Sequence, residues 1–206
     1  RDGLRLEQQG QVSAATVTAS ADPATLGPQD VVIVAVKAPA MAAVAAAIAP
    51  LLGPDTVVLT AMNGVPWWFL DGLGGEHAGQ RLTSVDADGA IGAALPIARI
   101  VGGVVHASCA LNGPGFVHHH FGQRLIVGEA RGGGSARVRA LAADLEAAGI
   151  EAPVSERIQR DIWFKLWGNM TMNPVSAITG APCDRILDDE LVRGFCSAVM
   201  REAQAI

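Results

Sequence analysis

Polar side chains with chemical potential form a line along one predicted helix. Lys165, Asn169 and Asn173 stand at four-residue intervals in the segment 160–174. At ~100° per residue they fall within an arc of ~80° and extend over ~12 Å of helix. A lysine ammonium can polarise a carbonyl group and donate a proton, and each asparagine amide offers two donors and an acceptor. This combination suits the binding of a small, oxygen-rich ligand.

The remainder of this helix is apolar. Ile158 and Ile162 extend the same face, and the far side carries Trp163, Trp167 and Met170. A helix that is apolar nearly all round is predicted to be buried, where unpaired amides and ammonium groups are costly. The structural alternative is that the lysine reaches water along its stem, the asparagines join helices, and the last asparagine caps a following helix.

A second set of polar groups follows two apolar runs. Lys37 comes directly after the run 31–36 (VVIVAV), and Asn63-Gly64 comes shortly after the run 56–61 (TVVLTA). The carboxyl ends of parallel strands share one edge of a sheet, where open α/β sheets bind ligands. Glycine lets the backbone turn or approach a ligand closely. The structural alternative is a surface lysine and an ordinary Asn-Gly turn.

The elements around these groups indicate a βαβ unit. The runs 31–36 and 56–61 are rich in β-branched residues and predict strands buried on both faces, as in parallel sheets. The alanine-rich segment between them has Pro39 near its start and Gly53-Pro54 after its end, which predicts a helix. A strand, a helix and a strand with short links form a βαβ unit with parallel strands.

The middle of the chain has a different pattern. Three short strands of an antiparallel meander are expected at 98–111, 115–122 and 123–129. A helix is expected from about Ser135 to Ala148, ended by Gly149. A short edge strand over 150–154 follows.

From Ser155 onward the pattern is helical. Ser155 is expected to cap a helix over about 156–173, which Pro174 stops because the residue before a proline avoids helical angles. Further helices are expected at about 174–179 and 185–206. The sequence therefore predicts an α/β part followed by an all-α part.

The composition excludes several functional classes. With 15 basic and 20 acidic residues among 206, the net charge is −5, so no nucleic-acid partner is expected. The longest apolar run, 38–52, is interrupted by prolines and too short to span a membrane, and the basic N-terminus lacks the apolar segment of a secretory signal. The three cysteines form no CxxC pair, which favours a reducing cytoplasm.

The histidine run 118–120 is not expected to bind a metal. His118 and His120 share a face if the segment is a strand, but no further ligand is in register with them. Structural zinc requires four ligands. Partly exposed histidines at the edge of a sheet are the simpler interpretation.

The motifs together resemble a known family. VKAPAM around Lys37, NGV at 63–65 and KLWGNMTMNPVSAITG at 165–180 resemble ketopantoate reductase, also called 2-dehydropantoate 2-reductase. The resemblance implies a Rossmann-type N-terminal domain and an all-α C-terminal domain, with the active site in the cleft between them. It also implies reduction of ketopantoate to pantoate with NADPH, on the route to pantothenate and coenzyme A.

The resemblance implies a role for each polar residue singled out above. Lys165 matches the catalytic lysine, which acts as general acid, and Asn63 matches an active-site asparagine near the nicotinamide. Asn169 and Asn173 match asparagines that hold the substrate, a small 2-keto acid. Lys37 and Gly64, together with Asn63, match positions near the cofactor.

The sequence also departs from the family pattern. It lacks the GxGxxG loop that binds the pyrophosphate, and it lacks a later serine and glutamate that bind substrate. We therefore expect a fragment with two incomplete domains, 1–155 of the Rossmann type and 156–206 of the helical substrate or dimerisation type. The loop that distinguishes NADP from NAD through the ribose 2′ position is missing with the first of these segments.

Other functional hypotheses remain open at this stage. A related dehydrogenase could act on another 2-keto acid, a 3-hydroxy acid or an opine, and a non-catalytic NADP-binding protein could share the fold. Trp67 and Trp68, just after Asn63, either mark a different 2-keto acid or pack against the sheet or at a subunit contact. Gly194, Phe195 and Met200 on the last helix could form a homodimer contact.

Overall fold

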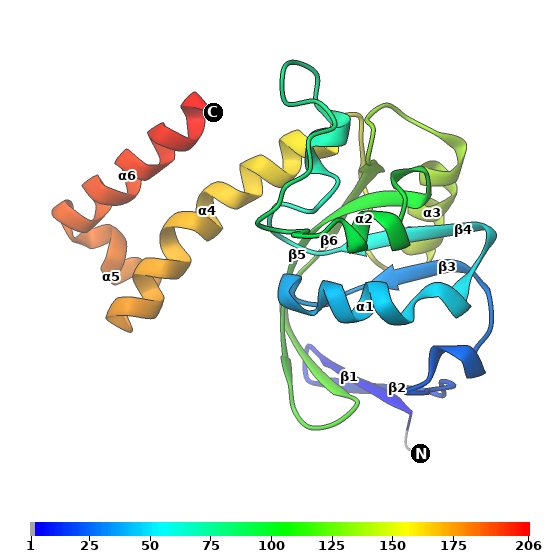
Figure 1. Cartoon of the computed structure of the whole chain (residues 1–206). Helices are drawn as coiled ribbons and strands as arrows, with labels where there is room; N and C mark the ends of the chain where they lie inside the picture. Colours follow the sequence, from blue (N-terminus) through cyan, green and yellow to red (C-terminus); the bar gives the residue numbers. More distant parts are fainter. Residues whose placement is uncertain (1–2) are drawn as a thin grey trace.

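The parallel strands expected at the ligand edge are present. The computed structural model describes residues 3–206. In it, β3 (Gln29–Val34) and β4 (Leu52–Ala61) pair in parallel, with Val32 opposite Val58. Between them runs α1 (Met41–Ala47), flanked by 3-10 turns at Ala38–Ala40 and Ala49–Leu51 (Figure 1). This confirms the βαβ unit.

The described strands form one mixed sheet in the order β2-β1-β6-β5-β4-β3, with β7 beside β6. The further strands are β1 (Leu4–Gln8), β2 (Gln11–Ala15), β5 (Ile100–Leu111), β6 (Phe116–Glu129) and β7 (Val154–Ser155). β5 is parallel to β4 and antiparallel to β6. Parallel strands linked by a helix are therefore joined to an antiparallel hairpin in a single sheet.

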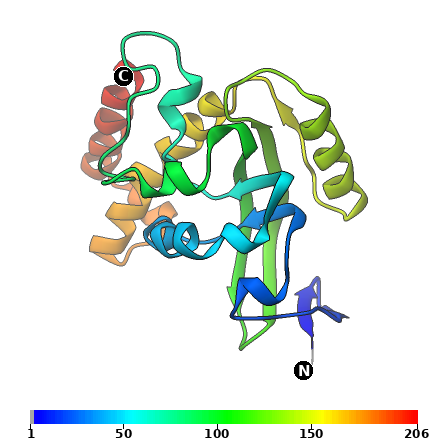
Figure 2. The same ribbon diagram turned by 45° about the vertical axis from the view of Figure 1, so that its right-hand side comes forward.

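Helices cover both faces of the sheet (Figure 2). On one face, α1, α2 (Ala90–Ala94) and the start of α4 enclose a core that includes Trp68, Leu95 and Val104. On the other face, α3 (Ala136–Ala147) buries Val138 and Leu141 against the sheet. This is the Rossmann-like arrangement expected for the first part of the chain.

The expected burial of both strands holds for β4 but not for β3. Val58 and Leu59 of β4 are fully buried. Val31 and Ile33 of β3 are 39% and 51% exposed. The reason is position: β3 is the last strand of the described sheet, and only its α1 side is covered, so the alternate residues face away from the core.

The expected meander is instead a single long hairpin. β5 and β6 pair along most of their length, and the turn between them is closed by Asn112 N–H donating to the Phe116 carbonyl at 2.8 Å. Gly122, expected to end a strand, lies inside β6 at φ +80°. The register between the two strands shifts nearby, between His106 and Cys109. The glycine therefore marks a β-bulge, where it supplies a left-handed conformation without ending the strand.

The helical part differs from expectation at its boundaries. α4 runs over Ile158–Thr179 and passes through Pro174, and α5 (Cys183–Asp188) and α6 (Glu190–Ala205) pack against it. A proline inside a helix removes one backbone hydrogen bond, and the packing against α5 and α6 retains the helix on both sides of it. The expected helix 185–206 is divided at Asp189, whose carboxylate caps α6 by accepting from the Leu191 and Val192 N–H groups.

The caps of α3 follow the prediction. The hydroxyl of Ser135 accepts from the Val138 N–H at 3.2 Å, and Gly149 follows the helix at φ +84°. None of the helices in residues 3–206 combines the length and apolar character needed to cross a membrane.

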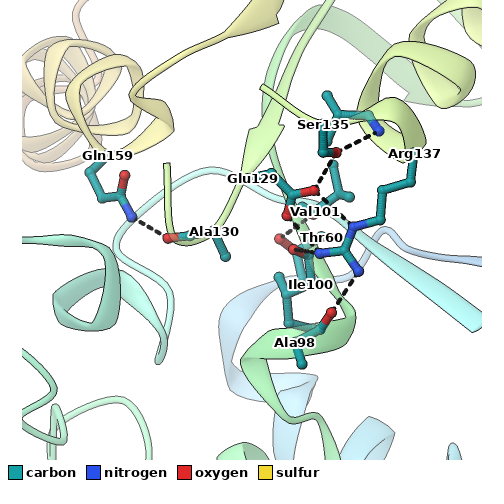
Figure 3. A network of polar contacts seen from close by, with 10 residues as sticks. Thr60, Ala98, Ile100, Val101, Glu129, Ala130, Ser135, Arg137 and Gln159 are labelled. Carbon is teal, nitrogen blue, oxygen red and sulfur yellow. Dashed lines mark hydrogen bonds and ion pairs between the residues drawn. The ribbon is translucent and has the colours of Figure 1, made fainter. Parts of the chain in front are cut away.

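A charged network fastens α3 to the sheet (Figure 3). Arg137 of α3 donates to both carboxylate oxygens of Glu129 on β6, at 2.8 and 2.6 Å, and to the Ala98 carbonyl at 2.6 Å. Ser135 donates to the same carboxylate. Burial alone would raise the pKa of Glu129, but the hydrogen bonds from Arg137 and Ser135 and the charge of Arg137 outweigh burial and lower it.

This network predicts a pH-dependent contribution to stability. Because the folded-state pKa of Glu129 is lowered, its stabilisation is present above the ordinary glutamate pKa of 4.5 and is lost as the pH falls through the folded-state pKa. We expect Glu129→Gln to lower the free energy of unfolding by about 2 kcal/mol at pH 7, and by progressively less below about pH 4.5. Urea unfolding across this range measures the difference.

Glu151→Gln is the matched control. Glu151 pairs with Arg124 at 3.2 Å, but both side chains are largely exposed. Such pairs contribute ~0–1 kcal/mol. Equal effects of the two substitutions, or an effect of Glu129→Gln that is constant down to pH 3, would contradict the prediction.

Candidate functional site

Two glycines let α4 lie close to the sheet. A Cβ atom on Gly102 of β5 would sit 3.0 Å from the Ile158 Cγ1 atom, and one on Gly128 of β6 would sit 3.1 Å from the Ile158 Cβ atom. Ile158 is fully buried at this crossing. The absence of side chains at these positions therefore fixes where α4 starts on the sheet, and with it the direction of every later residue on the helix.

The same face of α4 leads from Ile158 through Ile162 to Lys165, because residues at intervals of three and four share a helix face. Along β5, alternate residues bring Gly102 and His106 to the face that carries α4. Lys165 lies ~10 Å along the helix from Ile158. His106 lies ~13 Å along the strand from Gly102. This register brings Lys165 and His106 together.

The charges around His106 agree with this register. His106 is half-buried on β5. Its pKa is lowered by burial and then by the positive charges of Lys165 and Arg124, against the opposing effect of Asp161. Lys165 itself is half-buried and forms none of the ion pairs found among residues 3–206. Its ammonium is therefore near His106 but not committed to an acidic partner in the described chain.

Asn63 extends the sheet beyond the end of β4. The last backbone pair of β4 and β5 joins Ala61 to Gly103. Two residues further along each strand, the Asn63 Nδ2 donates to the Val105 carbonyl at 3.2 Å, and the Val105 N–H donates to the Asn63 Oδ1 at 3.1 Å. An amide side chain has the donor and acceptor of a peptide unit. The Asn63 side chain therefore forms the pair of hydrogen bonds with β5 that the next backbone residue of β4 would form. Asn63 thereby bonds Val105, the residue before His106, and the charge of Lys165 acts on the pKa of His106.

An apolar pocket opens beside Asn63. Its lining residues come mainly from the turn before α1 and the start of α1, the end of β4, the segment after β4, and α4, and include Met41, Thr60, Asn63, Gly64, Trp67 and Ile162. Gly64 adopts φ +95°, and a Cβ atom there would meet no neighbouring atom within 4 Å. The pocket therefore has apolar walls, one amide at its rim and open space over Gly64.

Of the other predicted residues, Lys37 adjoins this pocket, whereas Asn169 and Asn173 do not line it. Lys37 is exposed and precedes Ala38, which lines the pocket. Asn169 is half-buried and Asn173 is exposed, one and two turns beyond Lys165 on α4. The structure thus brings together Asn63, Gly64 and the α4 face that carries Lys165. The two asparagines follow on the projecting part of the helix.

The prediction that this helix is buried all round is wrong for the described chain. Phe164 is 72% exposed, and Ile178 is 86% exposed. Beyond its first turns α4 leaves the sheet, and α5 and α6 pack on one side only (Figures 1 and 2). A helix that is apolar all round can bury its whole surface. The described elements cover only part of the surface of α4.

Comparison with known proteins identifies the family to which this architecture belongs. A family model described as ketopantoate reductase PanE/ApbA matches residues 1–132, and its C-terminal counterpart matches residues 157–206. The chain belongs to the ketopantoate reductase family. Two 2-dehydropantoate 2-reductases are similar over most or all of the chain: one from Mesorhizobium japonicum at 44% identity and one from Halobacterium salinarum at 30%. The alignments cover 100% and 94% of this chain, and 63% and 60% of those proteins.

Solved structures of this family share the fold. A protein from Ralstonia solanacearum MolK2, provisionally named a ketopantoate reductase, superposes with a TM-score of 0.95 at 59% identity, covering 98% of this chain and 63% of that one. A 2-dehydropantoate 2-reductase from Geobacter metallireducens superposes with a TM-score of 0.81 at 27% identity, over 99% of this chain and 62% of that one. The chain therefore spans less than two thirds of the length of these relatives.

The pocket beside Asn63 has the character that the nicotinamide end of a family cofactor requires. Apolar walls suit the faces of a flat ring, and the amide of Asn63 at the rim suits a polar substituent. Lys37 is exposed and comes one residue before Ala38, which lines the pocket. No GxGxxG segment occurs in these 206 residues, so the fit concerns one end of a dinucleotide.

The tryptophans that follow Asn63 in this family member are buried. Trp68 is 1% exposed, and its ring lies where a Cβ atom on Gly102 would be, at 2.5 Å from that position. Trp67 is buried too, and both tryptophans form part of the pocket wall. Trp68 therefore packs against the sheet at Gly102 and also faces the pocket.

Sequence reasoning missed His106 and two of the charged residues that act on its pKa. His106, Arg124 and Asp161 come from three different elements. Asp161 could have been found, because it stands four residues before Lys165 on the same helix face. His106 and Arg124 could not, since their proximity depends on the pairing of β5 with β6 and on the glycines that seat α4.

The histidine run lies at the far end of the β5–β6 hairpin. His118 and His120 share a face, as expected, with ring centroids 4.6 Å apart, and His118 pairs with Glu7 at 3.0 Å. Among residues 3–206, no group of three or more His, Cys, Asp or Glu side chains is arranged to hold a metal ion.

The bonds of Asn63 can be tested directly. We expect Asn63→Asp to lower the free energy of unfolding by about 1–2 kcal/mol, because a carboxylate cannot donate to the Val105 carbonyl and instead faces it. Turnover should fall as well, since β5 is no longer held at Val105. Thermal unfolding and steady-state rates measure the two effects. Asn112→Asp, the same change in the exposed hairpin turn, is the control; an equal response of both variants would contradict the role of Asn63.

Proposed function

We propose that the full-length protein reduces ketopantoate to pantoate, with NADPH as the hydride donor and Lys165 as the general acid. The observation that supports this most is the convergence of Lys165 and Asn63 on Val105 and His106 of β5. Membership of the ketopantoate reductase family supports the substrate class, a small 2-keto acid. Reduction of this acid would supply pantoate to pantothenate and coenzyme A synthesis.

Lys165 would act at the carbonyl oxygen of the substrate. Reduction adds a hydride to C2, which NADPH supplies when bound, and leaves negative charge on the oxygen. A nearby ammonium stabilises that charge most strongly in the transition state, where it develops. An ammonium is also a far stronger acid than an alcohol, so Lys165 can then donate its proton to the oxygen.

The remaining residues would bind and orient. Asn63 would hold β5 at Val105 and present its free amide hydrogen to the nicotinamide side of the pocket. Lys37 and Gly64 would lie along the cofactor, and Asn169 and Asn173 would bind substrate from successive turns of α4. In this proposal residues 1–155 belong to the cofactor-binding domain, and residues 156–206 begin the domain that binds substrate.

The decisive experiment is a substrate and cofactor panel on the full-length protein. Oxidation of NADPH is followed at 340 nm with ketopantoate, with other branched and aromatic 2-keto acids, and with NADH in place of NADPH. We expect the highest kcat/KM with ketopantoate and NADPH. A higher kcat/KM with another 2-keto acid would identify that acid, and not ketopantoate, as the substrate. Cofactor binding without turnover of any acid would refute the catalytic proposal.

A further inference from the structure

His106 occupies a distinctive place between the elements that build the site. It directly follows Val105, whose N–H and carbonyl are both bonded to the Asn63 amide. It also lies on the face of β5 over which α4 crosses at Gly102. The backbone at His106 is therefore held by the same contacts that hold Asn63 and α4, and the residue is half-buried.

Charged groups face His106 from two elements. α4 contributes Lys165 and Asp161, which share a helix face, and the Asp161 carboxylate accepts a hydrogen bond from the Ser155 hydroxyl. β6 contributes Arg124, the direct cross-strand neighbour of His106, which also pairs with Glu151. Burial first, and then the charges of Lys165 and Arg124, lower the pKa of His106. The imidazole is therefore neutral at pH 7.

We propose that neutral His106 is a positioning residue, which accepts a hydrogen bond from the Lys165 ammonium and so holds it beside Asn63 for proton donation. This inference rests on the proposed function. A neutral imidazole offers one acceptor nitrogen, whereas an ammonium has only donors. A lysine side chain has a long flexible stem and many rotamers, and Lys165 has no acidic partner in the described chain. His106 is placed to select one of those rotamers.

Protonation of His106 would undo this arrangement. An imidazolium has two N–H donors and no acceptor, and its charge repels the ammonium of Lys165. The pKa of His106 lies below the ordinary histidine value of 6.5, so its imidazole gains a proton only as the pH falls below that value. Turnover should therefore decline on the acid side of neutrality, because the ammonium is no longer held at the carbonyl oxygen.

Two substitutions separate positioning from packing. His106→Gln keeps an acceptor that does not titrate, and His106→Leu keeps a similar volume without an acceptor. We expect His106→Leu to lower kcat at pH 7 by roughly tenfold, the effect of one lost hydrogen bond to a charged group, with little change in KM. His106→Gln should lose less and should lack the acidic decline of the wild type. His77→Gln, in an exposed loop, should retain that decline.

Equal losses in the Gln and Leu variants, or an acidic decline that persists in His106→Gln, would overturn the proposal. A second measurement does not depend on turnover. The imidazole of His106 is titrated by NMR in the wild type and in Lys165→Met, where loss of the ammonium should raise the pKa of His106. An unchanged pKa would refute the pairing even in an active enzyme. A raised pKa in a protein that does not reduce ketopantoate would refute the reductase function and leave the pairing intact.

Discussion

Lys165→Ala is expected to lower kcat for ketopantoate reduction by at least ~10²–10³-fold, the usual cost of removing one electrostatic donor from a developing oxyanion. Lys165 is half-buried and acts on the pKa of His106, the residue after the one that Asn63 bonds. In the proposed mechanism, loss of its ammonium removes both the charge that stabilises the oxygen and the proton that the product alcohol requires. Steady-state NADPH oxidation by the full-length protein measures the effect.

A change of this size should appear in kcat more than in KM, since the interaction is strongest in the transition state. Arg160→Ala is the matched control, because it removes another cation from the exposed side of the same helix. It should change the rate little. Near-normal turnover in Lys165→Ala, or equal losses in both variants, would show that the proton comes from elsewhere.

Gly102→Ala is expected to lower the free energy of unfolding by about 2–3 kcal/mol, the cost of overpacking a core. The added methyl group would lie 2.5 Å from the Trp68 Cη2 atom and 3.0 Å from the Ile158 Cγ1 atom. Both side chains are buried, so neither can move into solvent. Relief requires α4 to shift away from β5, which would also displace Lys165. Urea unfolding and turnover of the same preparation measure the two consequences.

Gly168→Ala is the control for this prediction. Gly168 lies on the exposed side of α4, and a Cβ atom there would meet nothing within 4 Å. Alanine is favoured over glycine in a helix by ~1 kcal/mol, so this variant should be slightly more stable than the wild type. If the Gly102→Ala variant were as stable as the Gly168→Ala variant, the inference that α4 packs closely on the sheet at Gly102 would be contradicted.

Local sequence was sufficient wherever neighbouring residues contain the cause of the structure. The β-branched runs correctly predicted the strands β3 and β4, and Ser135 and Gly149 marked the ends of α3. The four-residue spacing placed Lys165, Asn169 and Asn173 on successive turns of α4. These predictions succeeded because strand alternation, helix capping and helix periodicity act within a few residues.

Predictions failed where packing opposed a local preference. Pro174 was expected to end a helix, and Gly122 was expected to end a strand, yet α4 and β6 continue through them. In each case the cost of one irregular residue is smaller than the gain from the contacts on both sides of it. The exposure of β3 was also unpredictable, because a strand's position in the sheet depends on pairing with distant segments.

The sequence by itself determined that this chain has parallel strands with polar groups at their ends and a helix with a lysine and two asparagines in line. Only the tertiary structure decided that Asn63 bonds Val105, that Gly102 and Gly128 make room for Ile158, and that the charge of Lys165 acts on His106. The physical reason is the range of the interactions. Propensity and periodicity are properties of adjacent residues, whereas the site joins residues up to a hundred positions apart through strand register and close packing.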